Sequence, residues 1–394
     1  MIWFARRVGF AGMVLAPTFV FLMAVASSAA GLTVVPGQPV YDPAQWVLVA
    51  NHLHSAPGGS NGWSSGVKHI LTYCSARNIE FALMTDHNAI KTWFLPGFRV
   101  TGKTTPVGGM EWTSDQGHAN LIGFTASTPD QAILPCGIRG QAPCALEGQQ
   151  DHVAMVQQVH QRSGLVIINH PVLKGYRWPA GTCGADAVEV NRSWSDRYGV
   201  AARQWWHDKL LEGDRITGFG GSDYHYFRPL TNSDEEDGLE ESEHSNEASP
   251  LSPDIETPVN LVRVGEKTVA AVLDAVRAGH VQVLSDLAQP RVFLGCDANG
   301  DGVFDDYMMG DRVRLAEGAR VVIQVRVLGG KGQKLRVFDA KVGETITGRS
   351  PEVHDVTSDD FVLAIERTAS AGKDRFLRTE IGERGANVTN PLYY

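Results

Sequence analysis

Residues 45–54, QWVLVANHLH, combine a strand-forming run with two histidines at its end. In a β-strand, side chains two positions apart point to the same face. His52 and His54 would therefore converge on one point. Two converging imidazoles suit a metal ion, and the alternative is a chance pairing of histidines.

Strands and helices alternate along the first part of the chain. Val67, Ile70, Leu71 and Cys74 follow the spacing of an amphipathic helix. Such alternation is typical of a parallel sheet or barrel, and about eight strands favour a distorted β/α barrel in an α/β fold. The predicted strands are residues 45–54, 79–87, 105–112, 118–124, 164–171, 186–191, 215–225 and 259–264, and the predicted helices are residues 64–77, 150–163, 200–213 and 266–279.

From about residue 289 the apolar residues recur with a period of two. Residues 319–328 and 361–367 show this pattern, and residues 334–340 and 374–381 are further strand candidates. Short strands without a helical run predict a small antiparallel β-sandwich. We therefore expect a barrel domain at residues 31–288 and a β domain at residues 289–394.

The N-terminus has the pattern of a secretory signal. Arg6 and Arg7 precede an apolar run, which small residues follow, so we predict a signal peptide at residues 1–30 that is cleaved after Ala30. The alternative is an uncleaved membrane anchor. Cleavage would leave an extracytoplasmic protein, periplasmic or secreted, with no stable membrane span. The export route and the oligomeric state stay open.

The net charge of −9 is concentrated in one segment. Residues 234–247 hold eight carboxylates and predict a solvated acidic loop, which we place at residues 233–257. No basic stripe with interleaved aromatic residues occurs, so the sequence gives no support to nucleic-acid binding.

The chain has five cysteines. In an oxidising compartment Cys136 and Cys144 could close a short loop as a disulfide, and the alternative is two free thiols. No CxxC motif is present, so a zinc ribbon is not expected.

Most of the predicted barrel strands end in, or carry, a potential metal ligand. The C-terminal ends of barrel strands share one mouth, so these side chains should meet in a single cleft. One such histidine would carry little weight, but the whole set is typical of a metal site. The candidates are His52, His54, His87, Glu111, His118, His170, Asp223 and His225.

The same residues carry a resemblance to a known family. The motifs HLHS, TDHN, GMEW, GHANLIGF, INHP and GSDYH, in this order, resemble those of the PHP (polymerase and histidinol phosphatase) metallohydrolase superfamily. The remaining chain, including the C-terminal TNPLYY, is similar to the secreted branch of carbaryl hydrolases, the CehA/McbA group. The resemblance implies a distorted β/α barrel with two or three metal ions, held by the eight residues named above.

The chain departs from the family at two positions. Asn51 stands where the family often has Asp, and Asn61 stands where a further ligand is common. We therefore expect two divalent ions, with three as the alternative. Zinc, manganese and iron all suit imidazole and carboxylate ligands.

Such a centre predicts hydrolysis of a small-molecule ester substrate, the expected partner, by a metal-bound hydroxide. His118 or His225 could protonate the leaving group, and Asp86 could orient a ligand. Asn191 and Arg192 follow a strand end and could contact substrate, although a loop cap explains them equally well.

Three functions remain open from the sequence. The first is a phosphoesterase, the commonest activity of the family that the motifs resemble. The second is a carboxylic or carbamate ester hydrolase, which the secreted branch implies. The third is a binding module that the metal only stabilises, although structural sites are usually closed by four ligands.

A second ion site is conceivable near the start of the β domain. Asp297, Asn299, Asp301 and Asp305 have the spacing of a calcium loop, but Met308 stands where a bidentate glutamate is expected. The alternative is an Asp- and Gly-rich turn.

Overall fold

The computed structural model describes most of the chain. The described residues are 42–55, 64–135, 149–179, 181–191, 196–225, 255, 257–314, 316–344, 350–369, 374–383 and 386–394. Several predictions fall outside them and are not tested, namely the signal peptide, the acidic run 234–247, the disulfide between Cys136 and Cys144, and the roles of Asn61 and Arg192.

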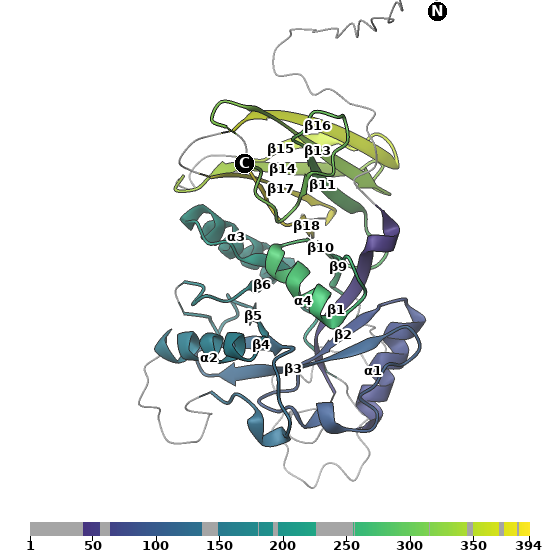
Figure 1. The fold of residues 1–394 in the computed structure, drawn as a ribbon, viewed down its shortest axis with the longest axis vertical. Helices are drawn as coiled ribbons and strands as arrows, with labels where there is room; N and C mark the ends of the chain where they lie inside the picture. Colours follow the sequence, from purple (N-terminus) through teal and green to yellow (C-terminus); the bar gives the residue numbers. More distant parts are fainter. Residues whose placement is uncertain are drawn as a thin grey trace, which may run out of the picture. The chain divides into compact units, whose positions relative to one another are not determined.

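The first part of the chain forms a mainly parallel sheet with helices between its strands (Figure 1). Its strand order is β10-β9-β1-β2-β3-β4-β5-β6-β7, and β8 pairs with β1. The strands are β1 (Trp46–His54), β2 (Phe81–Met84), β3 (Thr105–Ser114), β4 (Gly117–Ile122), β5 (Leu165–Asn169), β6 (Ala187–Asn191), β7 (Thr217–Gly220), β8 (Tyr224–His225), β9 (Val259–Arg263) and β10 (Val281–Leu284).

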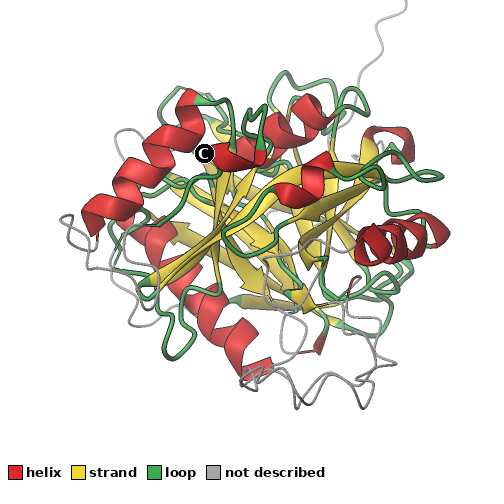
Figure 2. Cartoon of the chain, turned by 90° about the horizontal axis from the view of Figure 1, so that it is seen from below, coloured by secondary structure: helices red, strands yellow, loops and turns green. Residues whose placement is uncertain are grey.

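The helices lie around these strands (Figure 2). They are α1 (Ser64–Ala76), α2 (Gln149–Gln161), α3 (Asp196–Glu212) and α4 (Val269–Ala278). Helix α4 shows how the sequence sets their ends. The Thr268 side chain accepts a hydrogen bond from the N–H of Ala271, and Gly279 ends the helix with a left-handed φ of 79°.

Two strands run against the parallel direction that the sequence predicts. Strand β4 is antiparallel to both β3 and β5, and β9 is antiparallel to β1. Only Asp115 and Gln116 separate β3 from β4, and a connection of that length can form a hairpin but not a parallel crossover. The predicted strand 215–225 is likewise two strands, β7 and β8, separated by residues 221–223.

Side-chain amides join β7 to β9 and β10, the strands at the other end of the barrel sheet. The Asn260 side chain accepts from the N–H of Gly220 at 2.7 Å and donates to the same residue's carbonyl at 2.9 Å. Asn390 does the same for Gly218, at 2.7 and 2.9 Å. These amides replace the backbone pairing that a closed sheet would have, so the barrel is closed but distorted.

The C-terminal part of the chain forms antiparallel strands in two sheets. A four-stranded sheet has the order β12-β11-β13-β16, and the other strands extend the barrel sheet through pairing of β18 with β10. The strands are β11 (Arg291–Asp297), β12 (Tyr307–Met308), β13 (Arg320–Leu328), β14 (Lys334–Lys341), β15 (Glu352–Asp355), β16 (Asp360–Thr368), β17 (Arg375–Ile381), β18 (Asn387–Thr389) and β19 (Leu392–Tyr393).

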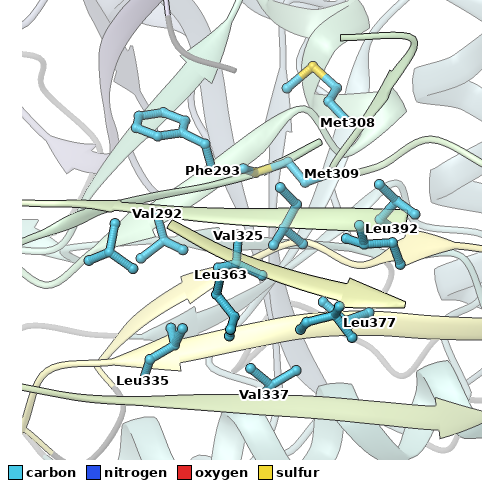
Figure 3. Packing of buried hydrophobic residues seen from close by; sticks show 14 of the residues in the cluster. Val292, Phe293, Met308, Met309, Val325, Leu335, Val337, Leu363, Leu377 and Leu392 are labelled. Atoms are coloured by element: carbon cyan, nitrogen blue, oxygen red, sulfur yellow. The ribbon is translucent and has the colours of Figure 1, made fainter. Parts of the chain in front are cut away.

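An apolar core lies between these two sheets (Figure 3). Val325 and Leu363 come from the four-stranded sheet, and Leu335 and Leu377 come from strands of the other sheet. All four side chains are completely buried, as the period-two pattern predicts. The predicted fold class, an α/β barrel followed by an antiparallel β-sandwich, is confirmed, while the domain boundary at residue 288 stays a prediction.

The helices that the structure describes include none with both the length and the apolar character needed to cross a membrane.

Candidate metal centre

All eight predicted ligands lie together, although they come from strands β1, β3, β4 and β8 and from the loops that follow β2, β5 and β7. Their donor atoms form three overlapping groups, in each of which the atoms lie within 4.8 Å of one another. The groups are His54, His87 and His225; His52, His54, Glu111 and Asp223; and Glu111, His118 and His170.

Glu111, on β3, is the centre of this cluster. Its Oε1 lies 3.2 Å from Nε2 of His52 and 3.0 Å from Nδ1 of His118. The same oxygen lies 3.4 Å from Nε2 of His170, and Oε2 lies 2.7 Å from Nδ1 of His87. Glu111 is completely buried, and with Nε2 of His54 at 3.7 Å from Oε2 its carboxylate faces five imidazoles.

Asp223 forms a second shared carboxylate. Its Oδ1 lies 3.0 Å from Nε2 of His52 and 3.2 Å from Nε2 of His54. His225 Nε2 is 3.4 Å from the same oxygen. The pairing of β1 with β8 sets His54 opposite His225, and their rings stack with centroids 4.1 Å apart.

Three cluster residues have a left-handed backbone. The φ angles are 65° at His52, 29° at His170 and 53° at Asp223. Residues other than glycine rarely adopt this conformation, and such strain gathers at functional sites.

The cluster favours opposite charge states at neighbouring groups. Burial disfavours charge on His52, but the carboxylates of Glu189 and Glu111 outweigh it and raise the pKa of His52 to about 9. Burial, aided by neighbouring imidazoles, lowers the pKa of His54 well below its ordinary value. Burial opposes the charge on Glu111, yet the surrounding imidazoles, His87 first, hold its pKa well below the usual range. Such opposed shifts are characteristic of functional sites.

The residues present fit divalent cations. Oε2 of Glu111, an atom at the centre of the cluster, is buried and makes no hydrogen bond among the described residues. A buried polar atom without a partner costs free energy, which coordination of its lone pair to a cation would offset. Imidazole nitrogens and carboxylate oxygens are also the donors that zinc, manganese and iron accept.

Two supporting residues were not among the sequence candidates. Glu189 on β6 accepts from His52 Nδ1 at 2.7 Å, and Asn169 Nδ2 donates to Glu111 Oε1 at 3.0 Å. Both side chains are completely buried. The sequence carries one signal for Glu189, a glutamate inside the otherwise apolar strand AVEVN.

The hydrogen bonds that the structure describes for Asp86 join it to Ser55 and Thr92 and not to a cluster imidazole. Its Oδ1 accepts from the N–H of Ser55 at 2.7 Å, and its Oδ2 accepts from Ser55 Oγ at 2.7 Å and from Thr92 Oγ1. It therefore holds the chain immediately after His54. Its predicted catalytic role is not tested.

Asn191 lies at the end of β6 and is 8 % exposed. Its Nδ2 donates to the carbonyl of Ala386 at 2.9 Å. The side chain thus joins the barrel to the C-terminal part of the chain. Substrate contact by Asn191 stays a prediction.

The possible calcium loop is stabilised by its own backbone. Asp297 accepts from the N–H groups of Gly300 and Gly302, and Asn299 and Asp301 each accept from the residue two positions on. The cation-sized groups found among the described residues do not include this loop. Calcium binding here stays a prediction.

Comparisons with known proteins leave the family open. No protein-family model matches the chain, and no curated protein matches it. A two-domain protein from Bacteroides vulgatus ATCC 8482, described as containing a predicted PHP-like metal-dependent phosphoesterase, is 14 % identical with a TM-score of 0.42, covering 93 % of this chain and 98 % of its own. PsfC from Pseudomonas syringae PB-5123 is 13 % identical with a TM-score of 0.38, covering 59 % of this chain and 87 % of its own.

The fold and the site define an α/β barrel protein with a buried cluster of histidines and carboxylates that could hold several metal ions. Any assignment of activity depends on this cluster and on the motifs that form it.

Proposed function

We propose that the chain is an exported, metal-dependent hydrolase of the PHP type that cleaves phosphate esters. The observation that carries the proposal is the position of Glu111, whose two oxygens face imidazoles from different ligand groups. A carboxylate shared in this way is suited to bridge two cations. Export rests on the signal-like residues 1–30.

Two divalent ions would be held by the eight cluster residues. They would lower the pKa of a water molecule and stabilise negative charge on the attacking and leaving oxygens, which is the chemistry that phosphoryl transfer requires. Glu111 and Asp223 would balance the charge of the ions. Six of the eight cluster residues are histidines and two are carboxylates.

A proton donor for the leaving group must lie where the substrate can reach it. The side chains of His87 and His225 are 27 % and 17 % exposed, whereas that of His118 is 7 % exposed. Tyr176 also packs on His118, with ring centroids 4.7 Å apart. Of the two predicted acids, His225 is therefore the better placed, in a role that would exclude it from holding an ion at the same time. Tyr176 would form one wall of the substrate site.

The test compares ester classes on one preparation. The purified protein is assayed for metal content and for hydrolysis of p-nitrophenyl phosphate, bis-p-nitrophenyl phosphate and p-nitrophenyl acetate. We expect about two equivalents of metal, turnover of a phosphate ester, and loss of that turnover after chelation.

The other outcomes separate the alternatives. Turnover of the acetate alone would favour a carboxylic or carbamate ester hydrolase. Bound metal without turnover of any ester would favour a binding module, and absence of bound metal after loading would contradict the proposal.

A further inference from the structure

Glu189 is a buried carboxylate that touches the cluster without belonging to any of the three ligand groups. It lies in the middle of β6 and is completely buried. Each of its oxygens contacts a different cluster residue. A buried carboxylate with such partners has a strong effect on their geometry, because charge-assisted hydrogen bonds are short and directional.

The first oxygen fixes one ring of the cluster. Glu189 Oε1 lies 2.7 Å from Nδ1 of His52. An ionised carboxylate can only accept, so Nδ1 carries the hydrogen and the lone pair available for a cation is on Nε2. That nitrogen faces Glu111 Oε1 at 3.2 Å and Asp223 Oδ1 at 3.0 Å, which is the position that a shared cation requires.

The second oxygen holds a strained backbone. Glu189 Oε2 accepts the N–H of His170 at 2.9 Å. His170 has a φ of 29°, a conformation that residues other than glycine seldom adopt. The hydrogen bond therefore stabilises the backbone that presents the His170 ring to Glu111.

A glycine after β7 leaves room for this carboxylate. A Cβ atom at Gly221 would lie 1.8 Å from Glu189 Oε1. Gly221 has no left-handed φ, so space and not backbone freedom explains the glycine here. Gly221, the second glycine of GGSD, thus leaves room for the Glu189 carboxylate next to the segment that carries Asp223.

We propose that Glu189 is a positioning residue of the metal centre, which sets the tautomer of His52 and the backbone of His170 without binding the metal itself. This inference rests on the proposed function, since it concerns the same cluster. Residues that orient a metal ligand in this way typically contribute 10–100-fold to metal affinity.

The substitution Glu189→Gln separates positioning from packing. Glutamine has the same shape but offers one acceptor and one donor. Its amide must therefore present a donor either to His52 Nδ1, which then loses the required tautomer, or to the N–H of His170. We expect zinc affinity to fall by about 10–100-fold, with an unchanged circular dichroism spectrum.

The measurement is competition for Zn²⁺ against a chelating dye on the full chain. Histidine ¹⁵N shifts of the zinc-loaded protein report the ring tautomer, which a purely structural role would leave unchanged. Glu80→Gln is the matched control, because Glu80 also accepts a backbone N–H, that of Leu48 at 2.8 Å, outside the cluster. Gly221→Ala is the second variant, since its methyl group would displace the carboxylate without removing it.

The outcomes are distinguishable from failure of the proposed function. If the wild-type protein binds no zinc, the proposed function fails. If the wild-type protein binds zinc and folded Glu189→Gln binds it equally well, only the positioning role is overturned. Should Glu189→Gln not fold, wild-type zinc affinity in Gly221→Ala would overturn it.

Discussion

At the scale of single residues, the cluster is held in conformations that the chain would not adopt by itself. Left-handed residues cost on the order of 1–3 kcal/mol each, so neighbouring groups must hold them. Glu189 binds the backbone of His170, and the Ser222 hydroxyl donates to the carbonyl of His52 at 3.2 Å. Such strain is expected where residues must hold their donor atoms in one arrangement.

His170→Ala tests the ligand set at this scale. Removing an imidazole from the cluster should abolish one metal equivalent and reduce ester hydrolysis by more than the roughly 10–100-fold typical of residues that only support a ligand. Metal content by mass spectrometry and phosphate release measure both. His160→Ala is the control, because His160 is a half-exposed histidine on α2 that pairs with Asp186 outside the cluster. Full metal content and activity in His170→Ala would remove His170 from the proposed site.

The sequence predicts the positions of the eight cluster residues because seven of them stand at strand ends or in the turns that follow. Glu189 could not be predicted in this way, since it lies in mid-strand among Ala187, Val188 and Val190. A glutamate there has two explanations, an exposed face or a buried partner, and the partner His52 is 137 positions away in the chain. Only tertiary structure distinguishes them.

At the scale of elements, the barrel depends on two asparagines instead of a continuous ladder. The Asn260 side chain satisfies both backbone groups of Gly220 and is completely buried. The apolar period predicts the strands themselves, but not this closure, because the two partners belong to elements far apart in the sequence. The antiparallel direction of β4 follows from its two-residue connection to β3, which is too short for the crossover that a parallel pair needs.

Asn260→Ala should destabilise the protein markedly. The substitution leaves the N–H of Gly220 without its side-chain acceptor, whereas the carbonyl of Gly220 keeps a hydrogen bond from Asn51 Nδ2 at 3.2 Å. A buried unsatisfied group costs about 1–3 kcal/mol. Urea denaturation of the metal-free protein measures the change in the free energy of unfolding. Asn260→Asp keeps the acceptor for the N–H of Gly220 but turns a buried carboxylate oxygen toward the carbonyl of Gly220, so this variant should be no more stable than Asn260→Ala. A change in Asn260→Ala of less than about 0.5 kcal/mol, as at ordinary surface positions, would contradict this role.

At the scale of the whole molecule, the C-terminal strands continue the barrel and cover it. Strand β18 pairs with β10, and the buried Arg378 of β17 donates to His207 Nδ1 on α3 at 3.1 Å. Asn191, at the end of β6, donates to Ala386 beside β18. The period of two in the apolar residues predicts the strands of the sandwich, but it does not predict these contacts with the barrel. Through them the C-terminal strands support the end of β6, the strand that carries Glu189.

The position of bound metal tests the central claim most directly. Crystals of the protein loaded with Mn²⁺ or Zn²⁺ would be measured at the absorption edge of the metal. We expect at least two anomalous peaks, with Glu111 coordinating both and with His52 and His170 among the ligands. Peaks that lie elsewhere, or a cluster that binds no ion at saturating metal, would contradict the account.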